Sequence, residues 1–136
     1  MKIIVCLDDD LGMLFNGRRQ SMDKAIRDRM TQITTGKALW MNTYSAGQFS
    51  DFPANAVVDE NFLDKAMEDD YCFLENIDIS AYASKVNTVI IYQWNRNYPQ
   101  DVRFPVSLFS HDWHLVSSCD FVGNSHDRIT EEVYYL

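Results

Sequence analysis

The sequence feature that most constrains the fold is an uncharged run of β-branched and aromatic residues, Thr-Val-Ile-Ile-Tyr, at positions 88–92. A strand with one face in water alternates apolar with polar side chains, and this run shows no such alternation. The run therefore predicts a central strand that is buried on both faces of an α/β sheet. A polar turn follows it, and Pro99 closes that turn.

Shorter segments on either side predict the rest of the sheet. Four further apolar runs are expected to be strands: residues 2–7, 38–41, 56–58 and 71–74. Segments of helical character separate them, at residues 22–33, 44–49, 62–67 and 77–84. Residues 113–116 and 132–136 are expected to form a closing β hairpin. The alternation predicts an α/β fold with a mostly parallel, helix-covered sheet and an antiparallel C-terminal strand.

Local signals predict how the first strand leads into the first helix. Residues 8–19 are punctuated by Gly12 and Gly17 and are expected to be a loop. We expect this loop to be mobile relative to the sheet, with faster amide exchange than at Ile90 and Ile91. Ser21 is expected to cap the first helix, so that the carboxylate of Asp23 lies in its first turn.

Length and cysteine usage indicate one reduced, cytoplasmic domain covering residues 1–136. The three cysteines, Cys6, Cys72 and Cys119, are odd in number and widely spaced among apolar residues, which favours buried thiols over a disulfide framework. The first apolar run ends at Leu7, too soon for a signal peptide. No apolar run is long enough to span a membrane.

The chain is acidic, with a formal net charge of −8. Between Lys37 and Lys85 the only basic residue is Lys65, whereas acidic residues are frequent. Such a field repels nucleic-acid backbones, so no nucleic-acid partner is expected. Two interpretations of this segment stay open: a surface that keeps the protein in solution, and a docking face for a basic protein partner.

The histidine and cysteine pattern does not predict a metal site. His111 and His114, with Cys119 nearby, are the most suggestive group. On a strand their spacing places the two histidines on opposite faces. We therefore expect no metal.

Several local patterns, in a shared order, resemble the dihydrofolate reductase family. Residues 11–13 (Leu-Gly-Met) are similar to the opening of the family's mobile active-site loop, and residues 35–41 to its Gly-Lys entry into the second strand. Residues 71–105 align with the family's second half without a gap, including an acidic-x-x-Phe-Pro segment at 101–105. Asp-Trp at 112–113 and Asn-Ser-His at 124–126 also recur near the C-terminus of many members. The resemblance implies the same α/β fold.

It also implies a small-molecule site with altered chemistry. Asp23 lies near the family's pterin-binding acid but about one turn early, and Ile26 takes that position in the ungapped register. Arg19 stands where many members have a loop tryptophan, and Tyr92 replaces a threonine. Asp23 is the catalytic candidate. The ligand pocket that the resemblance implies comprises Met13, Arg19, Met30, Phe73 and Tyr92.

The NADPH-binding elements of the family are missing. Its Arg-x-Thr segment corresponds to residues 42–45, where only the hydroxyl of Ser45 survives as a cofactor-binding candidate. Its Gly-Gly pair, which lets backbone approach the pyrophosphate, corresponds to Leu74 and Glu75. Residues 47–70 are markedly shorter than the family's adenosine-binding region.

Two functional classes remain. The first is a binding scaffold for a small molecule or a protein partner, without cofactor and without dihydrofolate reductase activity. The second is a divergent oxidoreductase of the pterin- and flavin-reductase class, using a nicotinamide such as NADPH or a flavin. The three missing cofactor elements favour the scaffold.

Overall fold

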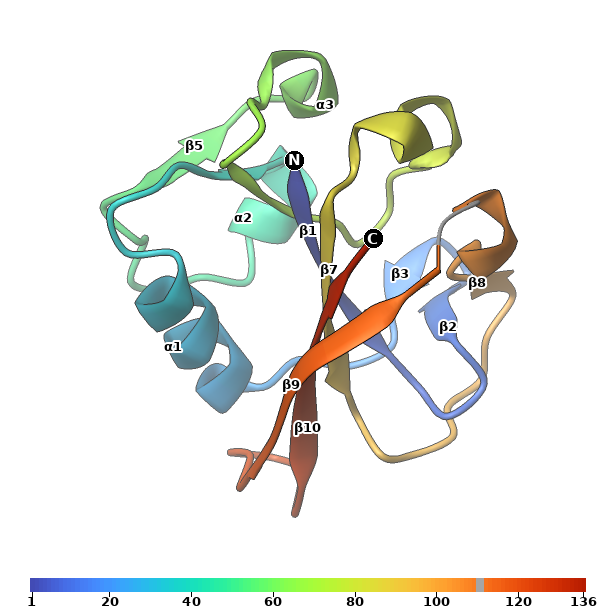
Figure 1. The fold of residues 1–136 in the computed structure, drawn as a ribbon. Helices are drawn as coiled ribbons and strands as arrows, with labels where there is room; N and C mark the ends of the chain where they lie inside the picture. Colours follow the sequence, from blue (N-terminus) through green and yellow to red (C-terminus); the bar gives the residue numbers. More distant parts are fainter. Residues whose placement is uncertain (110–111) are drawn as a thin grey trace.

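The computed structural model describes residues 1–109 and 112–136 and is built around a seven-stranded sheet (Figure 1). In order across the sheet the strands are β5 (Ala56–Val58), β4 (Leu39–Met41), β6 (Tyr71–Phe73), β1 (Lys2–Leu7), β7 (Thr88–Gln93), β10 (Ile129–Tyr135) and β9 (His114–Phe121).

The central strands run as the sequence predicts. β1 pairs in parallel with both β6 and β7, and β4 pairs in parallel with β5 and β6. β10 runs antiparallel to β7, and β9 runs antiparallel to β10. The expected mostly parallel sheet with an antiparallel C-terminal strand is confirmed. Every residue of 3–7 and 88–92 is buried except Cys6, which is partly exposed. The expectation that all three cysteines are buried is wrong for Cys119, which is exposed on the edge strand β9.

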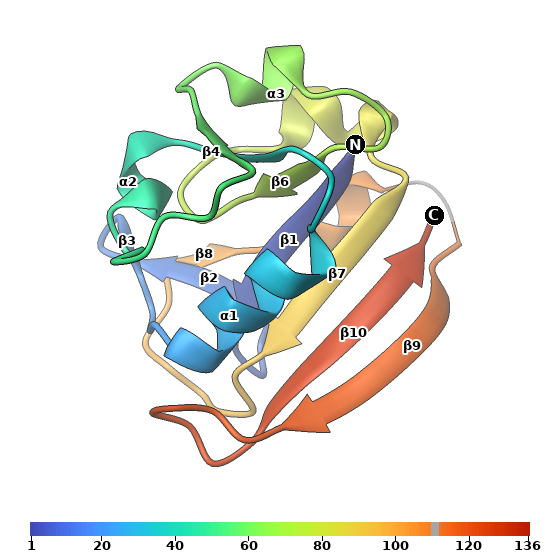
Figure 2. The same cartoon turned by 90° about the vertical axis from the view of Figure 1, so that its left-hand side faces the viewer.

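Each face of the sheet carries its own core, because successive side chains of a strand point to opposite faces. On one face Ile4 and Ile90 pack with Ile26 and Met30 of α1 (Lys24–Ile33), which crosses that face in Figure 2. On the other face Ile3, Val5 and Leu7 pack in a cluster that includes Phe62 of α3 (Phe62–Lys65).

The expected loop at residues 8–19 is wrong: most of it forms a hairpin. β2 (Gly12–Phe15) pairs with β3 (Arg18–Arg19) on one side and with β8 (Val102–Arg103) on the other. The turn between β2 and β3 is Asn16-Gly17, with φ of 52° and 71°. An Asn-Gly pair with positive φ at both residues makes the two-residue turn that suits the twist of a β hairpin. This second, three-stranded sheet places Arg19 beside the main sheet.

Two helix predictions also need correction. α1 begins at Lys24, and its cap is Asp23, whose carboxylate accepts a hydrogen bond from the backbone N–H of Ala25, so Ser21 lies outside the helix. The helix expected at residues 77–84 is a 3₁₀ segment. That 3₁₀ segment is η1 (Ser80–Lys85), and the other short helices are α2 (Thr43–Ala46) and the 3₁₀ helix η2 (Val106–Leu108). None of the helices in the described part of the chain has the length and apolar composition needed to cross a membrane.

Candidate functional site

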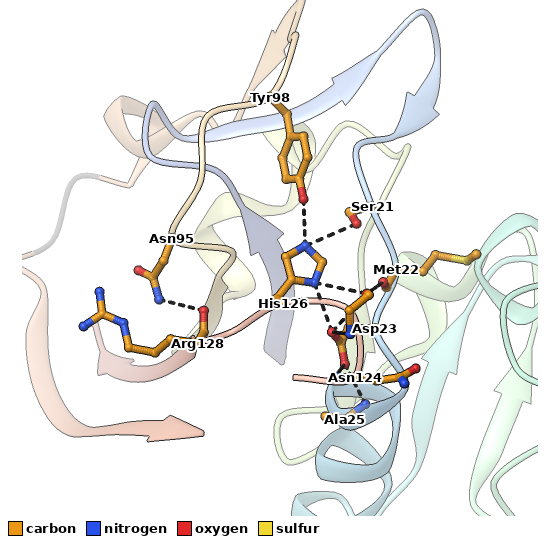
Figure 3. Close-up of polar contacts among 10 residues, drawn as sticks. Ser21, Met22, Asp23, Ala25, Asn95, Tyr98, Asn124, His126 and Arg128 are labelled. Atoms are coloured by element: carbon orange, nitrogen blue, oxygen red, sulfur yellow. Dashed lines mark hydrogen bonds and ion pairs between the residues drawn. The ribbon is translucent and has the colours of Figure 1, made fainter. Parts of the chain in front are cut away.

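A carboxylate, an imidazole and two hydroxyls meet where α1 begins (Figure 3). Nδ1 of His126 lies 3.0 Å from Oδ2 of Asp23. Nε2 of the same ring lies 2.7 Å from the hydroxyl of Tyr98 and 3.3 Å from that of Ser21. The side chains of Asp23 and His126 are 0% and 2% exposed, so this pair is shielded from water.

Asp23 is held as a carboxylate by convergent donors. The backbone N–H groups of Asn124, Ser125 and Ala25 donate to it at 2.7, 2.9 and 2.9 Å. Burial raises the pKa of Asp23, but these bonds and the one from His126 outweigh burial and lower the pKa to about 2. An ionised carboxylate only accepts hydrogen bonds, so Nδ1 of His126 carries a proton. In the neutral ring Nε2 is then the acceptor that faces the hydroxyls of Tyr98 and Ser21.

The loop between β9 and β10 brings His126 to this carboxylate. Gly123 donates its backbone N–H to the carbonyl oxygen of His126 at 2.9 Å, closing a tight turn. A Cβ at position 123 would lie 2.6 Å from Oδ2 of Asp23, a distance that only glycine avoids. The imidazole also stacks on Trp94, with ring centres 4.5 Å apart. The ring is therefore fixed in both position and orientation.

Arg19 joins three segments beside this cluster. Its Nε and Nη2 bind the two carboxylate oxygens of Glu75 at 2.8 and 3.1 Å. The guanidinium lies over the ring of Tyr44, 4.2 Å from its centre, and Nη2 also donates to the carbonyl oxygen of Tyr44. The pair is mostly buried, with side chains 20% and 9% exposed. Through these contacts Arg19 links hairpin β2–β3 to α2, which contains Tyr44, and to the segment after β6, which contains Glu75.

A cavity of about 490 Å³ lies between hairpin β2–β3 and the turn after β7, within the size range of small-molecule sites. Its lining residues are Phe15, Asn16, Arg18, Arg19, Gln20, Tyr98 and Pro99. A much smaller cavity adjoins it, sharing Arg19 and Gln20, and Ser21 is part of its wall. Tyr98 and Ser21, whose hydroxyls lie near Nε2 of His126, therefore line neighbouring cavities.

Gln20 lines both cavities, and its amide oxygen has no hydrogen-bond partner among the described residues. Its Nε2 donates to Oδ2 of Asp8 at 2.9 Å, which fixes the orientation of the amide because a carboxylate only accepts. Oε1 is then left buried, with no hydrogen-bond partner among the described residues. A buried acceptor without a donor costs about 1–3 kcal/mol, so this atom favours a ligand that carries an N–H or O–H group.

The pocket residues expected from the sequence fall into two groups. Met13 and Arg19 line the smaller cavity. Met30, Phe73 and Tyr92 lie together in the core beneath α1, and the hydroxyl of Tyr92 donates to the buried Glu131 at 2.8 Å.

The catalytic and cofactor candidates are also separated. Asp23 lies in the His126 cluster. Ser45 is fully buried in α2, and its hydroxyl has no partner among the described residues. The sequence reasoning did not assign His126, Tyr98, Ser21 or Gln20 to a site. The only signal was the Asn-Ser-His pattern at 124–126, which nothing in the sequence linked to Asp23.

Within residues 1–109 and 112–136 no group of three or more histidine, cysteine, aspartate or glutamate side chains is arranged to hold a metal ion. His111, part of the group considered from the sequence, lies outside the described residues.

No family model and no curated protein matches the sequence. Among solved structures the chain is similar to the dihydrofolate reductase from Enterococcus faecalis, complexed with NADP(H) and RAB-propyl. The TM-score is 0.63 at 10% sequence identity, and the match covers 98% of this chain and 94% of that one. At this identity the match shows the fold alone: the chain has a dihydrofolate reductase-like fold.

Proposed function

We propose that this protein uses a dihydrofolate reductase-like fold to bind a small organic anion, without NADPH, in the 490 Å³ cavity between hairpin β2–β3 and Tyr98. The observation that carries the proposal is a cavity of ligand size lined by Arg18, by aromatic side chains and by Gln20, whose Oε1 has no hydrogen-bond partner among the described residues. A ligand with an N–H or O–H group that reaches Oε1 would supply the hydrogen bond that this oxygen lacks.

The lining indicates the class of ligand. Arg18 is exposed, and among the described residues no carboxylate lies within ion-pair distance of it, so it offers one positive charge to a ligand. Phe15 and Tyr98 supply aromatic surface. One cation in a chain of net charge −8 favours a single anionic group over a polyphosphate. The ligand class is thus an aromatic or heteroaromatic acid that carries an N–H or O–H donor.

The residues present do not fit the phosphates of NADPH. By the sequence resemblance, the segment after β6 should leave room for a pyrophosphate, yet Glu75 places a carboxylate there and binds Arg19. Ser45, the one surviving hydroxyl, is fully buried. The guanidinium of Arg19 is already engaged by Glu75 and Tyr44, so it offers little to a phosphate.

Thermal-shift titration with a panel of heteroaromatic carboxylates and nucleoside monophosphates tests this proposal. We expect at least one compound to raise Tm, because a ligand that binds only the folded state stabilises it. Arg18→Ala and Gln20→Leu should each weaken that compound about tenfold or more, the effect of one lost charge-assisted or buried hydrogen bond.

Lys24→Ala is the matched control, because it removes an exposed cation that is paired with Asp28 and does not line this cavity. It should leave the affinity unchanged. Binding that is insensitive to Arg18→Ala and Gln20→Leu would place the ligand elsewhere. Saturation by low-micromolar NADPH would favour the oxidoreductase alternative.

A further inference from the structure

The contacts of His126 have the arrangement that enzymes use to activate a hydroxyl. A buried carboxylate fixes the Nδ1–H tautomer, and the opposite nitrogen accepts a hydrogen bond from a hydroxyl. Here the carboxylate is Asp23 and the nearer hydroxyl is that of Tyr98, at 2.7 Å. Figure 3 shows the Tyr98 hydroxyl directed at the imidazole from the side opposite Asp23.

Two features of the site exceed what a purely structural histidine requires. In the neutral ring, the hydroxyls of Tyr98 and Ser21 both lie within reach of the single lone pair on Nε2, so only one of them donates to it fully at any moment. Tyr98 also lines the 490 Å³ cavity, whereas Asp23 does not. The imidazole thus connects a shielded carboxylate to a residue at a ligand-sized cavity.

We propose that this site carries out acyl transfer, with Tyr98 as the nucleophile, His126 as its general base and Asp23 as the residue that positions the imidazole. The substrate class is an activated ester of a small organic acid. The proposal rests on the proposed function only for the place of the substrate, the cavity beside Tyr98.

The proposed step is balanced without a redox partner. The phenolic oxygen of Tyr98 bonds to the carbonyl carbon, and its proton passes to Nε2 of His126. The bond from that carbon to the leaving-group oxygen breaks, and the leaving group takes the proton from Nε2. Water then gives a proton to Nε2 and attacks the acyl-tyrosine, which releases the acid and restores the Tyr98 hydroxyl.

An aryl sulfonyl fluoride, 4-(2-aminoethyl)benzenesulfonyl fluoride, tests the nucleophile directly. It transfers its sulfonyl group to an activated hydroxyl with loss of fluoride, and peptide mass spectrometry locates the adduct. Tyr135, a residue that is 54% exposed, serves as the unactivated control within the same molecule. We expect Tyr98 to be labelled at least tenfold faster than Tyr135, although Tyr98 is the less exposed of the two.

His126→Gln should bring the labelling rate of Tyr98 down to that of Tyr135. His114→Gln, which removes an exposed histidine of β9, is the matched control and should change neither rate. Hydrolysis of p-nitrophenyl acetate should fall at least tenfold in both His126→Gln and Tyr98→Phe, and should be unchanged in His114→Gln.

The wild-type comparison decides the question even if His126→Gln does not fold. Equal labelling of Tyr98 and Tyr135 would overturn the proposal, and labelling of Ser21 in place of Tyr98 would overturn the choice of nucleophile. The proposed function fails separately, because its test is the sensitivity of ligand binding to Arg18→Ala. Labelling of Tyr98 reports on His126 whether or not that ligand binds.

Discussion

Arg19 and Glu75, 56 residues apart in the sequence, form a two-pronged ion pair with N–O distances of 2.8 and 3.1 Å. The guanidinium is also stacked over Tyr44. By the sequence resemblance, Arg19 belongs to the family's mobile loop, and Tyr44 and Glu75 belong to segments that bind NADPH in the family. In this chain the three are bound to one another, so the contact that supports hairpin β2–β3 occupies positions where, by the resemblance, the cofactor would bind.

Arg19→Ala should lower the free energy of unfolding by about 1–3 kcal/mol, because it leaves the mostly buried carboxylate of Glu75 without its charged partner. Urea unfolding followed by tryptophan fluorescence measures the change. Lys24→Ala removes an ion pair whose two side chains are 64% exposed and should have no measurable effect. Equal stability of the two variants would show that the Arg19 pair contributes little.

Amide hydrogen exchange should be faster in hairpin β2–β3 than at Ile90 and Ile91 of the central strand. The hairpin belongs to a sheet of three short strands, and local opening costs least where few buried contacts hold a segment. Arg19→Ala should accelerate exchange in the hairpin further. At Ile90 and Ile91 it should change the exchange rate only by the amount that the loss of global stability accounts for. Protection at Leu14 equal to that at Ile90 would contradict this expectation.

Asp23 should contribute to acid stability. Its folded pKa of about 2 lies below the ordinary 3.8, so its stabilisation is complete above about pH 4 and is lost as the pH falls from 4 towards 2. The contribution is about 2 kcal/mol. Urea unfolding of the wild type and of Asp23→Asn should therefore converge by about that amount between pH 5 and pH 2.

Asp69→Asn, at an exposed carboxylate, is the control and should follow the wild type through the same pH range. A constant difference between the wild type and Asp23→Asn across these pH values would mean that Asp23 does not titrate as its contacts indicate.

The sequence was informative where one segment alone determines the structure. The run at 88–92 places uncharged, mostly apolar side chains on both faces of the strand. It therefore predicted a central strand without information about the neighbouring strands. Strand β2 was missed because both of its partners are only two residues long, and one of them, β8, is distant in the sequence. The Asn16-Gly17 turn was the local signal that could have identified the hairpin.

The candidate site was harder to predict for the same physical reason. Asp23 and His126 are 103 residues apart, and Tyr98 is 28 residues from the histidine, so only the folded chain brings them together. Asp23 was noticed as an acid near the start of a helix, and it does cap that helix. Its distant partners could not be inferred from periodicity, because Asn124, Ser125 and His126 all lie in the loop between β9 and β10.

Tyr92→Phe should destabilise the protein by about 1.5–3 kcal/mol. The Tyr92 hydroxyl donates to Glu131 at 2.8 Å in the core, and Arg29 binds the same carboxylate from the side of α1. Removing the hydroxyl leaves a buried charged acceptor one donor short. Tyr134→Phe, which removes a longer and partly exposed bond to Glu132, should cost less. Chemical unfolding of both variants measures the difference, and equal losses would contradict the assignment.

NADPH should not bind with useful affinity, and dihydrofolate should not be reduced. A cofactor with several phosphate charges needs oriented N–H groups and at least one cation, each charge-assisted bond contributing about 1.5–3 kcal/mol. Here Thr43 stands in place of the family's arginine, Leu74 and Glu75 replace its glycines, and the carboxylate of Glu75 holds Arg19. Losing two or three such contacts weakens binding by about 3–6 kcal/mol, or two to four orders of magnitude.

Calorimetric titration of NADPH, with the Enterococcus faecalis reductase as the positive control, measures this directly. We expect no saturation at micromolar cofactor and no NADPH oxidation when dihydrofolate is added. Glu75→Gly, which removes the carboxylate and restores one glycine, should leave binding weak, because the cation at position 43 is still missing. Tight binding by the wild type would show that this fold holds the cofactor through contacts other than those of the family.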